Sequence, residues 1–222
     1  MKPRVAIIGA SDHGVVLADA VLAGSVFELG GFFDASETVR DRVDLPAPVL
    51  GTAISSCEQL RALGIDGILL GIGDNFSRQQ CWERLRKVLP EFYFPILIHP
   101  AASVSRRARL ADGVVVLAGA VVGPEAVVGE CVLLNTRSSL DHHGKMAAFA
   151  SLAPGVCTGG RVSIGEGSAI CLEAQVIHGR RVGANSVVGA GSLVLRDIPE
   201  NSLAWGVPAR VIRQRAPGER YL

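Results

Sequence analysis

Residues 120–152 read AVVGPEAVVGECVLLNTRSSLDHHGKMAAFASL, and an aliphatic side chain recurs at every sixth position of this stretch. The spacing extends in both directions, and fifteen of its sixteen members are apolar. The members are Val104, Leu110, Val116, Val122, Val128, Leu134, Leu140, Met146, Leu152, Thr158, Ile164, Ile170, Val176, Val182, Val188 and Val194. A small residue stands two positions before eleven of them, and Gly, Asn or Asp directly follows eight.

A period of six residues is typical of a coil with three short strands and three corners. Because side chains alternate along a strand, each aliphatic residue and the small residue two positions before it face the same interior. We assign the residue directly after each aliphatic one to the corner and expect it to tolerate a positive φ. An antiparallel sandwich with chance spacing is a poor alternative for sixteen unbroken periods. The prediction is a parallel β-helix of about five coils, in which residues 18 apart stack.

The first 98 residues follow another pattern, in which short apolar runs alternate with segments that look helical. The runs are residues 5–8, 30–33, 67–70 and 94–98, and the helices are expected at residues 13–22, 55–63 and 75–89, the second opened by Ser55 or Ser56. This alternation predicts a small Rossmann-like parallel sheet with covering helices. We therefore divide the chain into an α/β domain (residues 1–98), an all-β helix (99–213) and a C-terminal tail (214–222).

Composition excludes several function classes. The 222 residues are 49% hydrophobic and 19% charged, with a formal net charge of +1, so no basic excess points to nucleic acid. The apolar stretches are much shorter than the about 20 residues of a membrane span, and the N-terminus lacks the hydrophobic region of a signal peptide. We expect a cytoplasmic protein that does not insert into membranes.

Two motifs carry a resemblance to a known family. The segment NSLAWGVPARVIR (residues 201–213) resembles the closing segment of left-handed β-helix acyltransferases, and the chain opens with VAIIGASDHG (residues 5–14). Together they resemble the bacterial nucleotide-sugar N-acetyltransferases, which include the bacillosamine-pathway and perosamine enzymes and a sialic-acid O-acetyltransferase branch. The resemblance implies a left-handed coil and transfer of an acetyl group from acetyl-CoA to the 4-amino group of a nucleotide-linked 4-amino-4,6-dideoxy sugar.

In that family the first loop reads GAGGHG and holds the nucleotide of the sugar donor. A tight turn at a helix N-terminus suits phosphate, although Ser11 and Asp12 replace two of the usual glycines here. The sites that the resemblance implies lie at the carboxyl ends of the predicted strands, where α/β domains bind ligands. These candidate contacts are Gly9, Ala10, Ser11, Asp12, His13, Gly14, Asp34, Gly71, Gly73, Asp74 and Asn75. Turn residues and helix caps without a ligand are the alternative.

The family's general base is the eighth residue counted from a matching Asn, and counting from Asn135 gives His142. An imidazole titrates near neutrality and can accept the proton of an attacking amine, so no acyl-enzyme is required. Asp141 either orients this histidine or supplies a turn. Gly160, 18 residues on, is predicted to stack beside His142 and to offer its amide to the developing oxyanion.

Further contacts are implied for CoA, which in the family runs between neighbouring helices of a homotrimer. The candidates are Gly160, His178, Ala190, Gly191, Gly206, Pro208 and Arg210, the last for a phosphate. Closure of the last coil is an alternative role for residues 206–210.

Three other functions stay open. O-acetylation of a sialic-acid-type sugar is the nearest, since that branch shares both domains. A γ-type carbonic anhydrase would need three zinc-binding histidines, and His142, His143 and His178 lack its HxxxxH spacing, so no metal is expected. A non-catalytic sugar-binding protein would explain the altered GASDHG loop.

Overall fold

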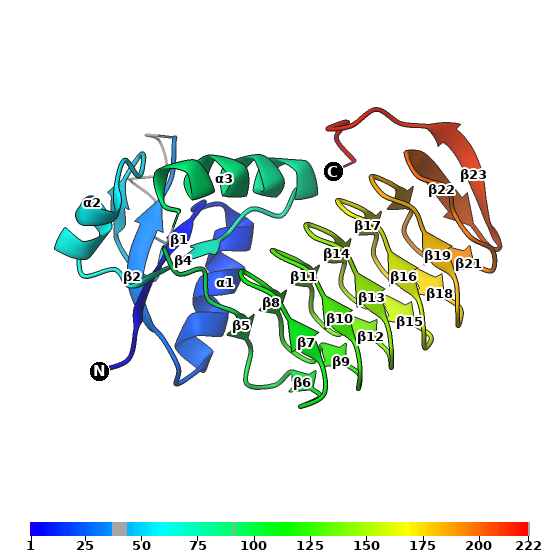
Figure 1. The fold of residues 1–222 in the computed structure, drawn as a ribbon, viewed down its shortest axis with the longest axis horizontal. Coiled ribbons are helices and arrows are strands. Elements are labelled where there is room, and N and C mark those ends of the chain that lie inside the picture. Colours follow the sequence, from blue (N-terminus) through cyan, green and yellow to red (C-terminus); the bar gives the residue numbers. More distant parts are fainter. Residues whose placement is uncertain (37–43, 91, 222) are drawn as a thin grey trace.

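A computed structural model describes residues 1–36, 44–90 and 92–221 and shows an α/β part beside a long β-helix (Figure 1). The α/β part contains β1 (Arg4–Ile8), α1 (Asp12–Ala23), β2 (Glu28–Phe33), β3 (Val49–Gly51), α2 (Cys57–Ala62), β4 (Gly67–Leu70) and α3 (Asn75–Val88). Its four strands form a parallel sheet in the order β3-β2-β1-β4. The Rossmann-like prediction is confirmed, but the short strand β3 was missed because its three residues carry no alternating pattern.

Seventeen two-residue strands, each followed by a turn, build the β-helix. They are β5 (Leu97–Ile98), β6 (Ser103–Val104), β7 (Arg109–Leu110), β8 (Val115–Val116), β9 (Val121–Val122), β10 (Val127–Val128), β11 (Leu133–Leu134), β12 (Ser139–Leu140), β13 (Lys145–Met146), β14 (Ser151–Leu152), β15 (Cys157–Thr158), β16 (Ser163–Ile164), β17 (Ala169–Ile170), β18 (Gln175–Val176), β19 (Arg181–Val182), β20 (Val187–Val188) and β21 (Leu193–Val194). The hairpin β22 (Ser202–Gly206) and β23 (Ala209–Gln214) closes the last coil.

The strands stack into three parallel sheets, one for each side of the coil. Residues 18 apart pair, as in Ser139 with Cys157 and Ser163 with Arg181, which confirms the predicted register. The aliphatic column fills the interior, and every member from Val116 to Val194 is at most 3% exposed. Because one repeating unit buries the same two positions each time, the core is continuous along the coil.

The predicted corner position was wrong by two residues. From Leu110 to Val188, the residue with positive φ is the third after each member of the aliphatic series, as at Glu125 (φ 61) and His143 (φ 56), and not the one directly after it. The glycines directly after the aliphatic residues have a different purpose. A Cβ on Gly129 would lie 2.7 Å from the Ala148 amide nitrogen of the next coil, so only glycine allows this close approach.

The fourth apolar run, residues 94–98, was also misassigned. It was expected in the α/β sheet, yet its strand β5 pairs with β8 and starts the β-helix. Just before this run, Tyr93 pairs with the α/β sheet through a bridge to Gly67. Two apolar runs of equal length do not reveal which sheet each one joins.

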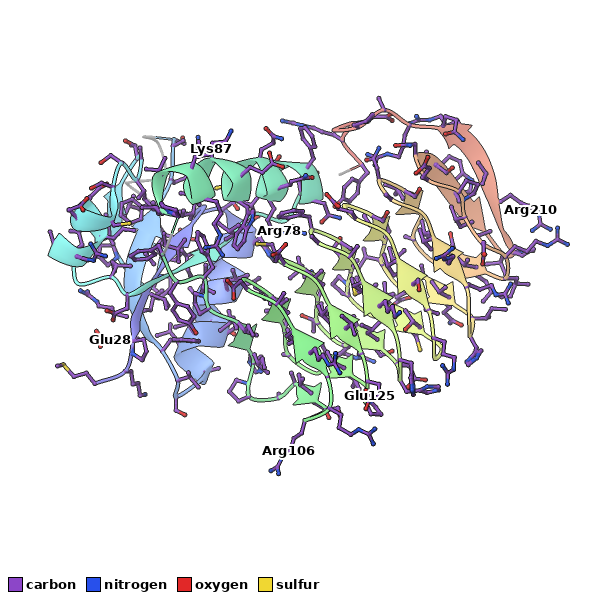
Figure 2. The ribbon with its side chains drawn as sticks, viewed as in Figure 1. Glu28, Arg78, Lys87, Arg106, Glu125 and Arg210 are labelled. Carbon is purple, nitrogen blue, oxygen red and sulfur yellow. The ribbon has the colours of Figure 1, made fainter. Side chains whose placement is uncertain are left out.

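Arg78 of α3 fastens the two parts together and is labelled near their junction in Figure 2. Its buried guanidinium donates five hydrogen bonds of 2.7–3.0 Å. The acceptors are the carbonyls of Cys131 and Phe149 in the β-helix, the carbonyls of Ile72 and Gly73, and the Asn75 side chain. Since every bond reaches backbone or a neighbouring amide, Arg78 fixes the loop after β4 against the β-helix.

Candidate functional site

His142 lies at a corner between β12 and β13, and its ring covers Gly160 of the next coil. A Cβ built on Gly160 would lie 2.2 Å from the His142 Nε2 atom, so the ring occupies the space that any larger residue would need. The Gly160 amide has no acceptor among the described residues. The stacking predicted from the 18-residue step is therefore present, and the His142 Nε2 lies against a residue whose amide is unpaired within the described residues.

Of the two roles that the sequence left open for Asp141, the contacts around His142 match the turn. The Asp141 carboxylate accepts the His142 backbone N–H at 2.6 Å and so shapes the turn. The ring contact comes from His143, whose Nδ1 lies 3.2 Å from the His142 Nδ1. The His178 ring lies further along the same corner, with its centroid 6.1 Å from that of His142. With His143 accepting from Nδ1–H, the lone pair of His142 would be on Nε2, the atom that faces Gly160.

A cavity of about 540 Å³ opens at the carboxyl ends of β1, β2, β3 and β4. Five of the predicted nucleotide contacts line it: Gly9, Ser11, Asp34, Gly71 and Gly73. Ser11 is the N-cap of α1, so the helix directs its positive end toward this space. A parallel sheet edge combined with a helix N-terminus suits a nucleoside diphosphate.

Asp34 also has a structural task at this edge. Its Oδ2 accepts the Ala10 N–H at 2.8 Å and its Oδ1 accepts the Ser36 N–H at 2.9 Å, which holds the loop after β1 in place. Gly14 is equally constrained, because a Cβ there would lie 2.0 Å from the Gly9 carbonyl oxygen.

Other predicted nucleotide contacts lie elsewhere. Asp74 is the N-cap of α3 and accepts the Ser77 N–H. Asn75 is 1% exposed and donates to the carbonyls of Gly167 and Ser168 in the β-helix, so its amide belongs to the junction. Ala10 is fully buried and Asp12 lies in the exposed first turn of α1.

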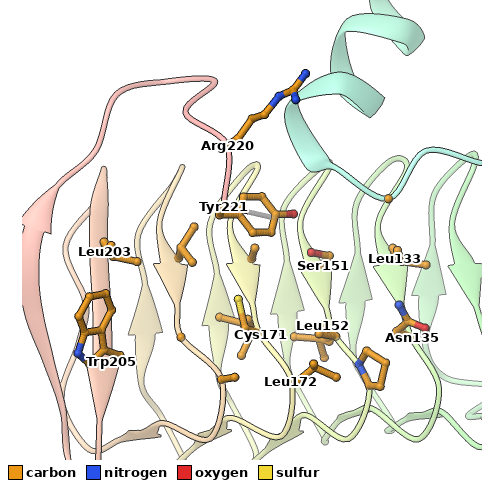
Figure 3. A pocket seen from close by; sticks show the side chains of 18 of the residues that line it. Leu133, Asn135, Ser151, Leu152, Cys171, Leu172, Leu203, Trp205, Arg220 and Tyr221 are labelled. Carbon is orange, nitrogen blue, oxygen red and sulfur yellow. The ribbon is translucent and has the colours of Figure 1, made fainter. Parts of the chain in front are cut away.

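A second and larger cavity, of about 820 Å³, runs along the outer face of the sheet that contains β11, β14, β17, β20 and β22 (Figure 3). We call it the groove. Its floor consists of outward-facing side chains that include Leu133, Ala169, Val187 and Leu203. His13 and Gly73 close the end toward the α/β part, and burial together with the positive charge of Arg78 lowers the pKa of His13 to about 4. His142 lines neither cavity.

Comparisons with known proteins find relatives of both the α/β part and the whole chain. The PglD N-terminal domain family matches residues 4–85. The perosamine N-acetyltransferase PerB from Caulobacter crescentus, solved with CoA and GDP-perosamine, is 33% identical with a TM-score of 0.81, covering 93% of this chain and 96% of that one. The acetyltransferase domain of PglB from Neisseria gonorrhoeae, solved with acetyl coenzyme A, is 32% identical with a TM-score of 0.85, covering 96% and 100%.

The chain belongs to the nucleotide-sugar N-acetyltransferases of the hexapeptide-repeat superfamily. Its β-helix is left-handed, as in that superfamily. Curated relatives include the serine acetyltransferase of Bacillus subtilis, 32% identical over 131 residues, which are 59% of this chain and 54% of that protein. Serine acetyltransferase 4 of Arabidopsis thaliana is 32% identical over 139 residues, 59% of this chain and 35% of that protein. The chain thus spans about a third to a half of the curated relatives it matches.

The predicted CoA contacts of this family member fall in three places. Ala190 lines the groove. Gly160 and His178 lie at the His142 corner instead, and Gly191 has a positive φ of 65° at the turn after Ala190. Gly206, Pro208 and Arg210 form the tip of the β22–β23 hairpin, where the only hydrogen bond recorded for the exposed Arg210 side chain within the described residues is to the Ala209 carbonyl.

Sequence reasoning missed the groove itself. Its walls include Leu172 from a corner of the coil, Trp205 from β22 and Tyr221 from the C-terminal tail. The exposed large apolar side chains Leu172 (53%) and Trp205 (48%) are the signal that could have indicated it. Within the described residues, no group of three or more His, Cys, Asp or Glu side chains is arranged to hold a metal, and no helix there could cross a membrane.

Proposed function

We propose that this protein transfers the acetyl group of acetyl-CoA to the 4-amino group of a nucleotide-linked 4-amino-4,6-dideoxy sugar, with His142 as general base. The observation that carries the proposal is the His142 ring covering Gly160, which brings a proton acceptor next to a residue whose amide is unpaired within the described residues. Relatives that match nearly the full length support the substrates, since PerB was solved with CoA and GDP-perosamine.

The reaction needs one proton acceptor and one oxyanion donor. The sugar amine attacks the thioester carbonyl carbon, so a C–N bond forms while His142 Nε2 takes a proton from the nitrogen. The negative charge that develops on the carbonyl oxygen is stabilised by the Gly160 N–H. The C–S bond then breaks, and the CoA thiolate leaves and receives a proton, so amide and free CoA are the products.

The two cavities fit the two substrates. The nucleoside diphosphate would bind at the sheet edge with Gly9, Ser11 and Gly71, beside the N-terminus of α1. The groove offers a long apolar floor for the pantetheine arm, with Ala190 along it. No covalent intermediate is required, because a deprotonated amine attacks a thioester directly.

We also propose a homotrimer, because His142 does not line the groove of its own chain. In a ring of three copies one surface meets a different surface of the next copy, so one subunit's groove would face the next subunit's His142. Light scattering in solution is expected to give three times the mass of the 23.2 kDa chain. A monomer that catalyses acetyl transfer would contradict this arrangement. The five unpaired cysteines suit the reducing cytoplasm, which we propose as its location.

The test is a substrate panel with the wild-type protein. Acetyl-CoA is incubated with UDP-, GDP- and dTDP-linked 4-amino sugars, and release of the CoA thiol is followed by its reaction with a chromogenic disulfide. One or more amino sugars should release CoA, and no release with any of them would refute the proposal.

Two further substrates distinguish the alternatives. Serine belongs in the panel because serine acetyltransferases are 29–36% identical over part of this chain. A sialic-acid-type sugar tests O-acetylation. CoA release with either of these, and none with the amino sugars, would assign the protein to the corresponding O-acetyltransferases.

A further inference from the structure

The C-terminal tail does not hang free of the β-helix. From the end of β23, residues 213–221 run back along the coils toward the N-terminus of α3 (Figure 1). We call residues 213–221 the strap. It crosses the sheet whose outer face forms the groove, and it touches both parts of the molecule.

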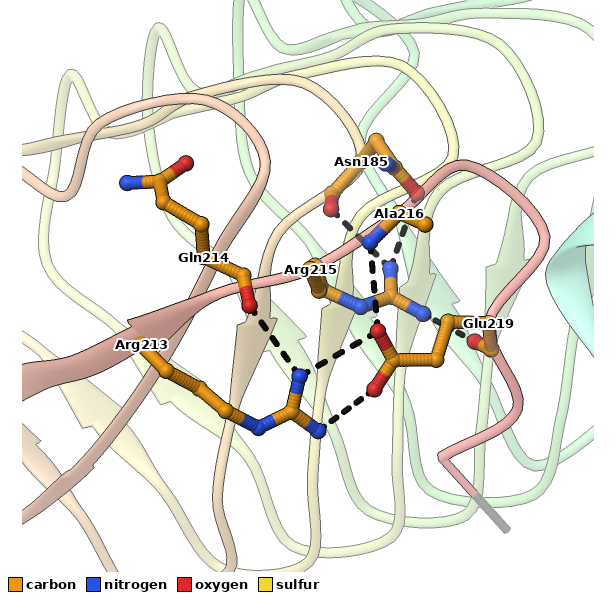
Figure 4. A network of polar contacts seen from close by, with 6 residues as sticks. All are labelled: Asn185, Arg213, Gln214, Arg215, Ala216 and Glu219. Carbon is orange, nitrogen blue, oxygen red and sulfur yellow. Dashed lines mark hydrogen bonds and ion pairs between the residues drawn. The ribbon is translucent and has the colours of Figure 1, made fainter.

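Two arginines fix the near end of the strap (Figure 4). Arg215 is 8% exposed, and its guanidinium donates to the Asn185 carbonyl at 2.9 Å and to the Asn185 Oδ1 at 2.8 Å. The Arg213 guanidinium contacts both carboxylate oxygens of Glu219, which also accepts the Ala216 N–H. These contacts close residues 216–219 into a turn, and they lower the pKa of Glu219 to about 2.

The far end of the strap is anchored on α3 and β14. A Cβ on Gly218 would lie 2.9 Å from the Phe76 ring, so the strap backbone packs directly on the first turn of α3. Burial raises the pKa of the Tyr221 hydroxyl, and the charge of Arg78, the Ser151 side chain and the Asn75 backbone oppose this shift. The Tyr221 ring stands over the sheet beside Ser151 in Figure 3.

The strap thereby becomes a wall of the groove, whose lining includes Glu219, Arg220 and Tyr221. Its three arginines differ in what they have left to bind. Arg213 forms an ion pair with Glu219. The Arg215 guanidinium already donates hydrogen bonds to Asn185 and to the strap backbone. Among the described residues nothing pairs with the Arg220 guanidinium, which is exposed at the rim of a groove whose floor is apolar.

We infer that the strap determines binding of the acyl donor: Tyr221 packs against the pantetheine arm of CoA, and Arg220 binds one of its phosphates. An apolar floor with one free guanidinium at the rim complements a ligand that is neutral along its length and anionic at one end. The inference rests on the proposed function for the identity of the donor. It adds two residues from the tail to the binding site.

The experiment measures binding without turnover, by titration calorimetry and by the fluorescence of Trp205 in the groove. The probes are CoA and pantetheine, which lacks phosphates. Arg220→Ala should weaken CoA binding about tenfold and leave pantetheine binding unchanged, because it removes one charged contact. Tyr221→Ala should weaken both ligands by a similar factor, because it removes a ring from the wall.

Matched controls come from the α/β part. Arg61→Ala and Tyr93→Ala remove the same side-chain types at exposed positions that line neither cavity, and they should bind both ligands as the wild type does. Deletion of residues 216–222 should weaken both ligands more than either point variant.

Unchanged CoA affinity in Arg220→Ala and Tyr221→Ala would overturn the inference. Wild-type protein that binds CoA through these residues but acetylates no sugar in the panel would refute only the proposed function. Wild-type protein that does not bind CoA would overturn both.

Discussion

The β-helix and the α/β part use their polar residues in opposite ways. In the β-helix the backbone hydrogen bonds form between successive coils. The His142 side chain is therefore not needed to hold the fold, and its ring lies over Gly160. In the α/β part, polar side chains expected at a nucleotide hold the fold, as Asp34 does for Ala10 and Asn75 for the β-helix. A departure from a strict repeat is therefore better evidence for function than a polar residue in an irregular loop.

The largest change in stability is expected from Arg78, where the α/β part meets the β-helix. Arg78→Met leaves five acceptors without their donor, so the free energy of unfolding should fall by about 4 kcal/mol. Urea denaturation followed by circular dichroism measures the loss. The exposed Arg61→Ala is the control, and equal midpoints for the two variants would show that Arg78 does not hold the parts together.

The next largest effect is the pH dependence of the free energy of unfolding that His13 of the α/β part contributes. His13 has its pKa lowered to about 4, so the unfolded chain binds its proton first as pH falls. The free energy of unfolding should therefore decrease between about pH 6.5 and pH 4, by about 3 kcal/mol for this group. His13→Asn should lose that part of the slope. Parallel stability curves for wild type and variant would contradict the assignment.

Crowding the His142 corner should impair catalysis more than stability. Gly160→Ala places a Cβ where the His142 ring lies, and a displacement of about 1 Å typically costs about 100-fold in rate. Initial rates with acetyl-CoA and the best amino sugar measure the loss. His178→Ala, at the same corner but with its ring 6.1 Å away, should lose much less. Wild-type rates in Gly160→Ala would remove Gly160 from the site.

The smallest effects test the corrected corner geometry. Gly129→Ala should lower the free energy of unfolding by about 2 kcal/mol, because its Cβ would meet the next coil. Glu173→Gly should instead raise it by about 0.5 kcal/mol, because Glu173 has a φ of 56°. Thermal melts of the two variants should shift in opposite directions. Shifts of the same sign would show that the corner residue was misplaced again.

The sequence predicted the β-helix well because one physical rule, burial of every sixth side chain, is repeated sixteen times. It also placed His142 over Gly160, since the 18-residue step follows from the same rule. It failed where contacts join distant segments. Neither the partners of Asn75 nor the return of the tail over the groove leaves a periodic signal, because both depend on how two separately folded parts meet.

The most direct test of the central claim is the reaction of His142→Asn with acetyl-CoA and the best amino sugar of the panel. Asparagine keeps the approximate size and polarity of the ring but cannot accept the proton at neutral pH, so amide formation should fall about 100-fold or more. The acetylated sugar is quantified by mass spectrometry, with His99→Asn as a control outside both cavities. If His142 is the general base, the wild type and the control form the N-acetyl product at similar rates and His142→Asn forms it about 100-fold or more slowly. Wild-type product formation by His142→Asn would contradict this role.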